Sequence, residues 1–175
     1  KPLARLLGYM CSDGSISENG IALSQVSNNV VDDFKEIVRD LFHIEVGKEV
    51  RDSRAQAELY GIPVNSRELS AYMRYLGVTV HDENLQIPLI IRKSSRAYVI
   101  EFLKGVTLDG YVSKDKICVS TSISKQYLQQ LQALLLNIGI DSGIYQSSEA
   151  SFRKFPNSDK LYPVAWGYLR PLGVS

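Results

Sequence analysis

The stretch Leu6-Leu7-Gly8-Tyr9-Met10-Cys11-Ser12-Asp13-Gly14 decides how this chain folds. It is an apolar run with one glycine inside it and an Asp-Gly pair at its end. A second run of the same kind is Phe102-Leu103-Lys104-Gly105-Val106-Thr107-Leu108-Asp109-Gly110. An apolar helix with glycine on one face allows a second helix backbone to approach closely. The two runs therefore predict a pair of helices that pack against each other through Gly8 and Gly105.

The acid at the end of each run is the second signal. Glycine readily adopts the left-handed conformation, so the Asp-Gly pair predicts the end of a helix. A negative charge is unfavourable there, at the negative end of the helix dipole. Either aspartate alone could be an ordinary acid before a turn glycine. Two of them at matching helix ends predict a joint cation site at Asp13 and Asp109, because adjacent carboxylates repel unless cations lie between them.

Composition limits the class of protein. The chain has 175 residues, of which 45% are hydrophobic and 22% charged, as expected of one compact domain or two small halves that share a core. A formal net charge of +1 does not by itself argue for nucleic acid. No apolar run is long enough for a membrane span, and two cysteines make neither a disulfide framework nor a zinc site. An intracellular setting is expected: the cytoplasm and nucleoid, or a nucleus or organelle, depending on the source.

The order of hydrophobic patterns repeats along the chain, and the two aspartates are 96 residues apart. We predict a first half at residues 1–80, a connector at 81–94 and a second half at 95–175. The predicted fold class is α+β: a pseudo-twofold pair of αββαββα units with two antiparallel sheets, helices on one face and the other face free for a ligand. In the second half, strands are expected at residues 111–113, 117–121, 140–146 and 161–169, with a long loop at 147–159.

At this level of detail the sequence resembles a family. Both runs look like the signature helices of LAGLIDADG homing endonucleases in their two-motif monomeric form, and the resemblance is closest to endonuclease domains lodged inside inteins. Four blocks carry it in the right order, at residues 6–15, 85–90, 102–112 and 128–140. The resemblance implies a monomer with an internal pseudo-dyad whose sheets form a saddle over the major groove of double-stranded DNA.

The resemblance also implies chemistry. Asp13 and Asp109 would bind divalent ions, normally Mg²⁺, and each would serve the scissile phosphate of one strand. The expected product is a staggered double-strand break in a long target. Gln25 would lie near the catalytic water, with Thr121 as its approximate partner in the second half, and Lys93 is the candidate basic residue. Expected phosphate or base contacts are Lys48, Arg51, Arg54, Lys114, Lys116, Arg153 and Lys154.

Two departures leave alternatives open. Asp13 follows Gly8 by five positions, whereas Asp109 follows Gly105 by four. One residue turns a helix by about 100°, so an inactive or nicking-only enzyme is one alternative, and a catalytically impaired DNA-binding module of the same fold, such as a regulator or degenerate intein domain, is another. A protein-interaction domain without nucleic acid is a third. The chain also lacks the terminal residues of intein splicing, so we expect either the endonuclease segment of an intein or a free-standing relative.

Overall fold

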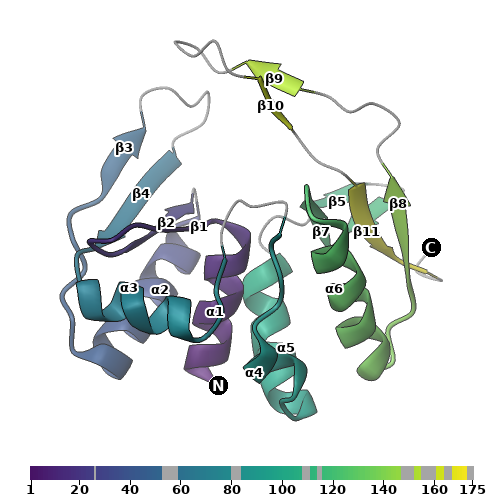
Figure 1. The fold of residues 1–175 in the computed structure, drawn as a ribbon, viewed down its shortest axis with the longest axis horizontal. Helices are drawn as coiled ribbons and strands as arrows, with labels where there is room; N and C mark the ends of the chain where they lie inside the picture. Colours follow the sequence, from purple (N-terminus) through teal and green to yellow (C-terminus); the bar gives the residue numbers. More distant parts are fainter. Residues whose placement is uncertain are drawn as a thin grey trace.

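The structure is a computed structural model of the chain. It describes residues 1–25, 27–52, 59–79, 84–107, 111–113, 116–146, 152–154, 161–163 and 167–172. Two helices lie side by side at its centre, α1 (Pro2–Ser12) and α5 (Arg96–Val106), and each is followed by strands of its own half (Figure 1). One hydrophobic core runs through both halves, from Leu6 and Leu7 of α1 to Phe102 of α5 and Leu131 in the second half.

The first half has the predicted order of elements. After α1 come β1 (Gly14–Ile16), β2 (Ile21–Gln25), α2 (Asn28–Phe42), β3 (Val50–Asp52), β4 (Leu59–Val64) and α3 (Arg67–Tyr75). The four strands form an antiparallel sheet in the order β1-β2-β4-β3. Its helix-facing side is apolar, with Leu23 on β2 and Ile62 on β4 fully buried, as the alternation of strand side chains requires.

The second half repeats this topology with additions. A short helix, α4 (Leu89–Arg92), lies in the connector before α5. The later elements are β5 (Tyr111–Ser113), β6 (Lys116–Cys118), β7 (Ser120–Ser122), α6 (Lys125–Asn137), β8 (Ser142–Gln146), β9 (Phe152–Lys154), β10 (Leu161–Pro163) and β11 (Gly167–Pro171). Strands β6 and β7 are one strand interrupted at Val119, whose N–H still donates to the carbonyl of Leu169 at 2.9 Å. The order β5-β6/β7-β11-β8 therefore matches β1-β2-β4-β3.

The second half also differs from its predicted unit. The single strand predicted at 161–169 is wrong, because β10 pairs with β9 whereas β11 pairs with β7 and β8. Strand β9 lies inside the loop predicted at 147–159. It is only three residues long and is flanked by turn-forming residues, so the sequence pattern did not indicate a strand. Strand β11 is the last element that the structure describes.

Helix-capping signals were easier to read from the sequence. The Ser66 hydroxyl accepts a hydrogen bond from the Leu69 N–H at 3.1 Å, and the Ser124 hydroxyl accepts one from the Tyr127 N–H at 3.2 Å. Each satisfies an N–H that the first turn of a helix leaves without a partner. Gly77, just past α3, has a φ of +84°. These caps confirm the predicted starts of α3 and α6 and the predicted stop of α3.

Both cysteines are free and buried. Desolvation raises the pKa of the Cys11 thiol to about 12, so it stays protonated and serves as a small core side chain. Among the helices that the structure describes, none has the length and apolar character needed to cross a membrane.

Candidate active site and DNA interface

The two central helices touch backbone to backbone. A methyl carbon placed on Gly8 would lie 2.2 Å from the Phe102 carbonyl oxygen and 2.9 Å from the Gly105 Cα. One placed on Gly105 would lie 2.5 Å from the Arg5 carbonyl oxygen. Both positions are closer than real Cβ contacts, which essentially never fall under 3.0 Å. The structure thus brings the two predicted interface glycines together, with no room for a side chain on either.

Asp13 lies at the C-terminal end of α1, where it is the C-cap residue. The side-chain amide of Gln25 donates to its Oδ2 at 3.1 Å, and the Ser12 hydroxyl donates to the same oxygen at 3.2 Å. The Asp13 carbonyl accepts from the Ser24 N–H at 3.0 Å, which fixes the end of the helix to β2. No basic residue occupies the last turn of α1. The carboxylate therefore adds to the negative end of the helix dipole, and a bound cation would offset both charges.

Gly14 has a different role from the one predicted. It begins β1, and among the glycines that the structure describes only Gly77 and Gly139 have positive φ. A methyl carbon on Gly14 would lie 2.5 Å from both the Cα and the carbonyl oxygen of Met10. The left-handed helix stop inferred from Asp13-Gly14 is therefore wrong. Glycine is needed here because the outgoing strand folds back against the last turn of α1.

Gln25 presents its amide to Asp13 in a defined orientation. It ends β2 on the helix-facing side and is only 8% exposed. Its Oε1 accepts a hydrogen bond from the Ser27 N–H at 3.3 Å, which leaves the NH₂ group to donate to Asp13. A buried side-chain amide requires partners of this kind. Asp13 and Gln25, which the family resemblance assigned to one site, are thus in direct contact.

The second half ends its central helix sooner. Helix α1 continues four residues past Gly8, whereas α5 ends one residue past Gly105, with Thr107 as C-cap. Asp109 lies outside the described residues, so the predicted pairing of the two aspartates stays a prediction.

Thr121 does not occupy the position of Gln25. Its side chain is exposed, whereas its neighbours Ser120 and Ser122 are buried. Ser122 is the residue on the helix-facing side, and both Gln25 and Ser122 follow the helix-contact glycine of their own half by 17 residues. Counted from the aspartates instead, Thr121 and Gln25 both lie 12 residues on, so the one-residue difference comes from the shorter second motif. The Ser122 hydroxyl accepts from the Ser124 N–H at 3.0 Å and has no amide to offer a carboxylate.

Lys93 lies away from the predicted site. It is the exposed C-cap residue of α4, just before α5 begins. A cavity of about 240 Å³ is lined by Lys1, Leu3 and Ala4 together with Ser94 and Tyr98, so α1 and α5 start at the same end of the molecule. Asp13 is at the other end of α1, an 11-residue helix that spans roughly 16 Å at 1.5 Å per residue. The structure therefore does not support Lys93 as the basic residue of this site.

An ion-pair network links α1, α5 and α2 on the flank of the glycine contact. The Arg5 guanidinium donates from Nε to Glu101 Oε2 at 2.9 Å and from a terminal nitrogen to Asp33 at 2.7 Å. Lys104 reaches the other oxygen of Glu101 at 2.8 Å, and the Tyr9 hydroxyl donates to Asp33. Hydrogen bonds from Lys104 and Arg5 lower the pKa of Glu101 to about 2, despite its burial. Sequence patterns did not single out this network, because its members are far apart in the chain.

Replacing Glu101 with glutamine is expected to destabilise the fold and to alter its acid response. Because the folded-state pKa of Glu101 lies below its ordinary value of 4.5, its contribution is present above pH 4.5 and is lost as the pH falls toward 2. The loss at neutral pH should be on the order of 1 kcal/mol, since the network is partly exposed. Urea unfolding measured from pH 2 to 7 tests this, with the exposed Glu36→Gln as control. An unchanged pH profile in Glu101→Gln would contradict the assignment.

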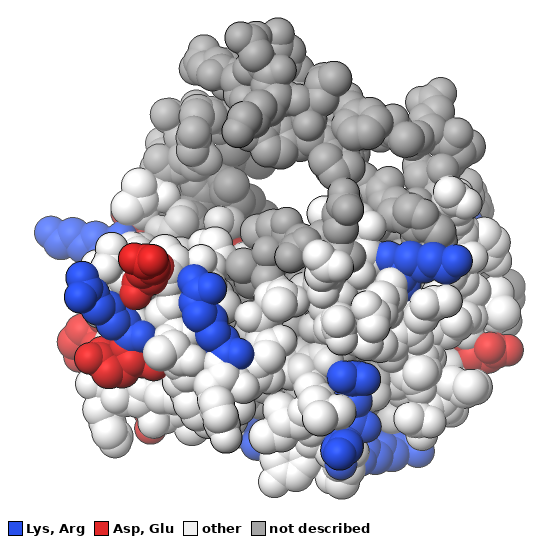
Figure 2. All heavy atoms as spheres, viewed as in Figure 1, with Lys and Arg blue, Asp and Glu red and all other residues white. Residues whose placement is uncertain are grey.

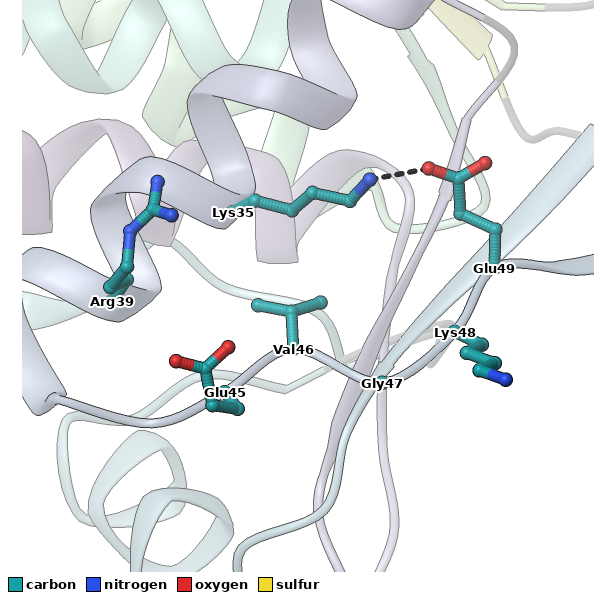
Figure 3. Close-up of a pocket in the computed structure, with 7 residues that line it drawn as sticks. All are labelled: Lys35, Arg39, Glu45, Val46, Gly47, Lys48 and Glu49. Carbon is teal, nitrogen blue, oxygen red and sulfur yellow. Dashed lines mark hydrogen bonds and ion pairs between the residues drawn. The ribbon is translucent and has the colours of Figure 1, made fainter.

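Most of the predicted DNA contacts lie on or beside described strands. Lys48 is exposed just before β3, at a cavity of about 390 Å³ lined also by Lys35, Arg39 and Glu49 (Figure 3). There Lys35 pairs with Glu49, while the Lys48 side chain points away from that pair. Four of the other predicted contacts lie on described strands: Arg51 on β3, Lys116 on β6, and Arg153 and Lys154 on β9. Arg54 and Lys114 lie outside the described residues.

The face shown in Figure 2 has no cluster of basic side chains among its described residues. In Figure 2 the Lys and Arg side chains are dispersed among uncharged residues, and Asp and Glu side chains lie beside some of them. Among the described residues no group of three or more His, Cys, Asp or Glu side chains could hold a metal ion. A cation at Asp13 would therefore draw its remaining ligands from water, from a phosphate or from parts of the chain not described.

Comparison with known proteins identifies the fold. Residues 97–162 match the model of the LAGLIDADG-like domain family. A solved structure of variants of the homing endonuclease I-DmoI superimposes with a TM-score of 0.67 at 16% identity, over 97% of this chain and 87% of that one. The second half of the chain thus matches the LAGLIDADG-like domain family, and the whole chain has the LAGLIDADG fold. The N-terminal LAGLIDADG domain of DUF199/WhiA also shares the fold, with a TM-score of 0.59 at 14% identity over 83% of this chain and 70% of that one.

Two curated relatives of this chain are much longer proteins. It is 31% identical over 149 residues to a probable translation initiation factor IF-2 of Thermococcus kodakarensis, covering 80% of this chain and 12% of that protein. It is 28% identical over 145 residues to a component of the A-type ATP synthase of Methanopyrus kandleri, covering 81% of this chain and 13% of that protein. The chain thus spans about an eighth of the length of each. The predicted family resemblance is confirmed, and the closeness to intein-encoded members stays a prediction.

Proposed function

We propose that this chain is a site-specific DNA endonuclease that makes a staggered double-strand break in a long target by metal-dependent phosphodiester hydrolysis. The observation that carries the proposal is the carboxylate of Asp13, which lies at the end of the central helix pair and is oriented by the buried amide of Gln25 at 3.1 Å. The fold supports it, because I-DmoI is a homing endonuclease and has been solved with DNA together with Ca or Mn.

A divalent cation fits the donor set at Asp13. Carboxylate oxygens are the hard ligands that Mg²⁺ prefers, and Mg²⁺ usually keeps several water ligands beside one or two carboxylates and a phosphate. When bound, the ion would supply an activated water and charge neutralisation at the leaving oxygen. Asp13 would hold it. Gln25 would fix the carboxylate, because its own amide is held in turn by the Ser27 N–H.

The substrate is proposed to lie across the two sheets. Helices cover one face of each sheet, and α1 and α5 join the two halves between them (Figure 1). The opposite faces carry alternate side chains that could reach base edges in a major groove. Arg5 and Glu101 flank the glycine contact from opposite halves. Because their charges are complementary rather than identical, this interface favours pairing of the two halves within one chain, in agreement with a monomer.

The chain's relatives support an origin within a host protein. A translation initiation factor and an ATP synthase component have different tasks, yet each contains a segment similar to this chain over about an eighth of its length. A domain shared by proteins that are otherwise unlike each other is what an inserted, mobile element would produce. We therefore propose that this chain is the endonuclease segment of an intein, as the resemblance implied.

The second candidate function is DNA binding with impaired cleavage. Two observations favour it: α5 ends three residues sooner after its glycine than α1 does, and Ser122 stands where the first half has Gln25. A fold shared with the LAGLIDADG domain of DUF199/WhiA is compatible with it. If only the first half retains its catalytic groups, the product would be a single-strand nick.

Selection followed by cleavage distinguishes these functions. The chain is first used to select duplexes from a randomised library in Ca²⁺, and the selected sequence is then placed in a supercoiled plasmid with Mg²⁺. Linear product supports a double-strand endonuclease, nicked circles support a single active half, and binding without cleavage supports the DNA-binding module. Failure to select any sequence would refute DNA recognition in both forms.

Replacing Gln25 with alanine is expected to slow cleavage by about 10- to 100-fold, the usual cost of losing a group that orients a metal ligand. The matched control is Ser122→Ala, at the corresponding position of the second half, which removes no contact to a described carboxylate. Single-turnover rates on the selected duplex provide the measurement. Equal rates for Gln25→Ala and Ser122→Ala would show that the amide does not serve the site.

A further inference from the structure

The open face of the second sheet carries a cluster of two tyrosines and one arginine. Tyr145 on β8 and Tyr168 on β11 are direct cross-strand partners, and their rings stack with centroids 5.6 Å apart and planes 14° from parallel. The Arg170 guanidinium lies 4.6 Å from the Tyr168 ring centroid and 5.5 Å from that of Tyr145. All three side chains are outside the predicted set of DNA contacts.

These side chains point away from the helices. On β11 the residues Gly167 and Leu169 are buried, while Tyr168 and Arg170 alternate with them and are partly exposed. Leu169 belongs to the core that includes Leu131 of α6, so its side of the strand faces the helix. Tyr145, which pairs with Tyr168, is 40% exposed. The cluster is therefore on the sheet face that the proposed function assigns to DNA.

Arg170 is held in place by the two rings, and its guanidinium has no carboxylate partner among the described residues. Within the same part of the chain, its Nε is buried without a hydrogen-bond partner. Stacking on aromatic rings holds the planar guanidinium through cation–π attraction. Because its rotamers are already restricted, less entropy is lost when its terminal nitrogens donate to a ligand. Such an arrangement suits a planar acceptor that takes two parallel hydrogen bonds.

We propose that Tyr145, Tyr168 and Arg170 form a base-reading site that recognises guanine in the major groove. This inference rests on the proposed DNA function. Guanine presents O6 and N7 as a pair of acceptors on its major-groove edge, and an arginine fork meets both. The first half has Gly61 and Pro63 at the matching positions of β4, which are small or lack a polar side chain. The two halves therefore read unlike sequences, and the target need not be palindromic.

The test compares base preferences selected from a randomised duplex library in Ca²⁺. For the unmodified chain we expect one guanine position, on one side of the target centre, to be strongly preferred. Arg170→Ala should reduce that preference by about 5- to 150-fold and leave the other positions unchanged. Arg170→Lys keeps the charge but not the fork, so it should lose the guanine preference while the salt dependence of binding stays the same. Arg74→Ala, on the exposed face of α3, is the control and should change neither property.

Substitutions of Tyr168 test separately whether its ring positions the Arg170 guanidinium. Tyr168→Phe keeps the aromatic surface and should retain the guanine preference, whereas Tyr168→Leu should weaken it even though Arg170 is intact. Thermal unfolding checks that each variant is folded. If Arg170→Ala weakens binding equally for all sequences and reduces the salt slope by about one, the arginine contacts a phosphate and the proposal is overturned. If the unmodified chain and Arg170→Ala select the same sequence with the same preferences, Arg170 does not read a base, although the chain still recognises DNA. If the unmodified chain selects no sequence, both the base-reading site and the proposed DNA function are refuted.

Discussion

Replacing Gly8 with valine is expected to destabilise the fold by about 3 kcal/mol or more, the upper range for overpacking a core. Even the first added carbon would lie 2.2 Å from the Phe102 carbonyl oxygen and 2.9 Å from the Gly105 Cα, so the neighbours that must yield are backbone atoms of α5 rather than flexible side chains. Separation of α1 from α5 would also disturb the adjacent Arg5–Glu101 contact. Urea or thermal unfolding followed by circular dichroism gives the measurement.

The matched control is Gly61→Ala on β4. A methyl carbon there meets only the Val50 carbonyl oxygen at 3.6 Å, an ordinary contact, and Gly61 has no positive φ. Its effect should stay within about 1 kcal/mol, because strand propensities span only that range. Gly8→Ala should fall between the two variants. A Gly8→Val protein as stable as the unmodified chain would show that the central helices are not held at backbone contact.

The central helices and the helix starts at Ser66 and Ser124 could be predicted from the sequence because each depends on residues that are close together in the chain. An apolar run with one glycine admits few packings other than a close helix contact, and Ser66 and Ser124 mark helix starts by a hydrogen bond within three residues. Gln25 was assigned to the site by the family resemblance. Its contact with Asp13 follows from the Glu18-Asn19-Gly20 turn, whose short antiparallel return brings the end of β2 back to the helix.

The errors arose where one residue changes the facing of a strand. A one-residue slip moves every side chain to the other face. Thr121 matches Gln25 in its distance from the aspartate, but Ser122 matches it in its distance from the glycine and is the buried residue. Lys93 was misplaced because nothing local shows that α5 starts beside the start of α1. Arg170 was missed because its stacking partner Tyr145 comes from another strand, which sequence spacing does not reveal. The Arg5–Glu101 pair has one possible signal, opposite charges about one turn before each interface glycine.

Replacing Asp13 with asparagine is expected to lower the cleavage rate on the order of 10³-fold, the upper end of what the loss of one charge-stabilising group costs. Asparagine has nearly the same shape, and its carbonyl can still accept from Gln25 and Ser12. Only the negative charge that holds a cation at the end of α1 is removed. Duplex affinity in Ca²⁺ should change far less, since the open sheet faces rather than this end of the helix would carry most of the DNA contacts.

The variant also decides how the two halves share the reaction. If each half cuts one strand, Asp13→Asn should convert linear product into nicked circles, and the strand labelled at its 5′ end shows which cut is lost. If only the first half is competent, as Ser122 and the early end of α5 suggest, the unmodified chain gives nicked circles and Asp13→Asn gives no product. Fold stability should be equal or slightly higher in the variant, because a carboxylate at the negative end of a helix dipole is lost. Undiminished cleavage of both strands by Asp13→Asn would refute a catalytic role for this carboxylate.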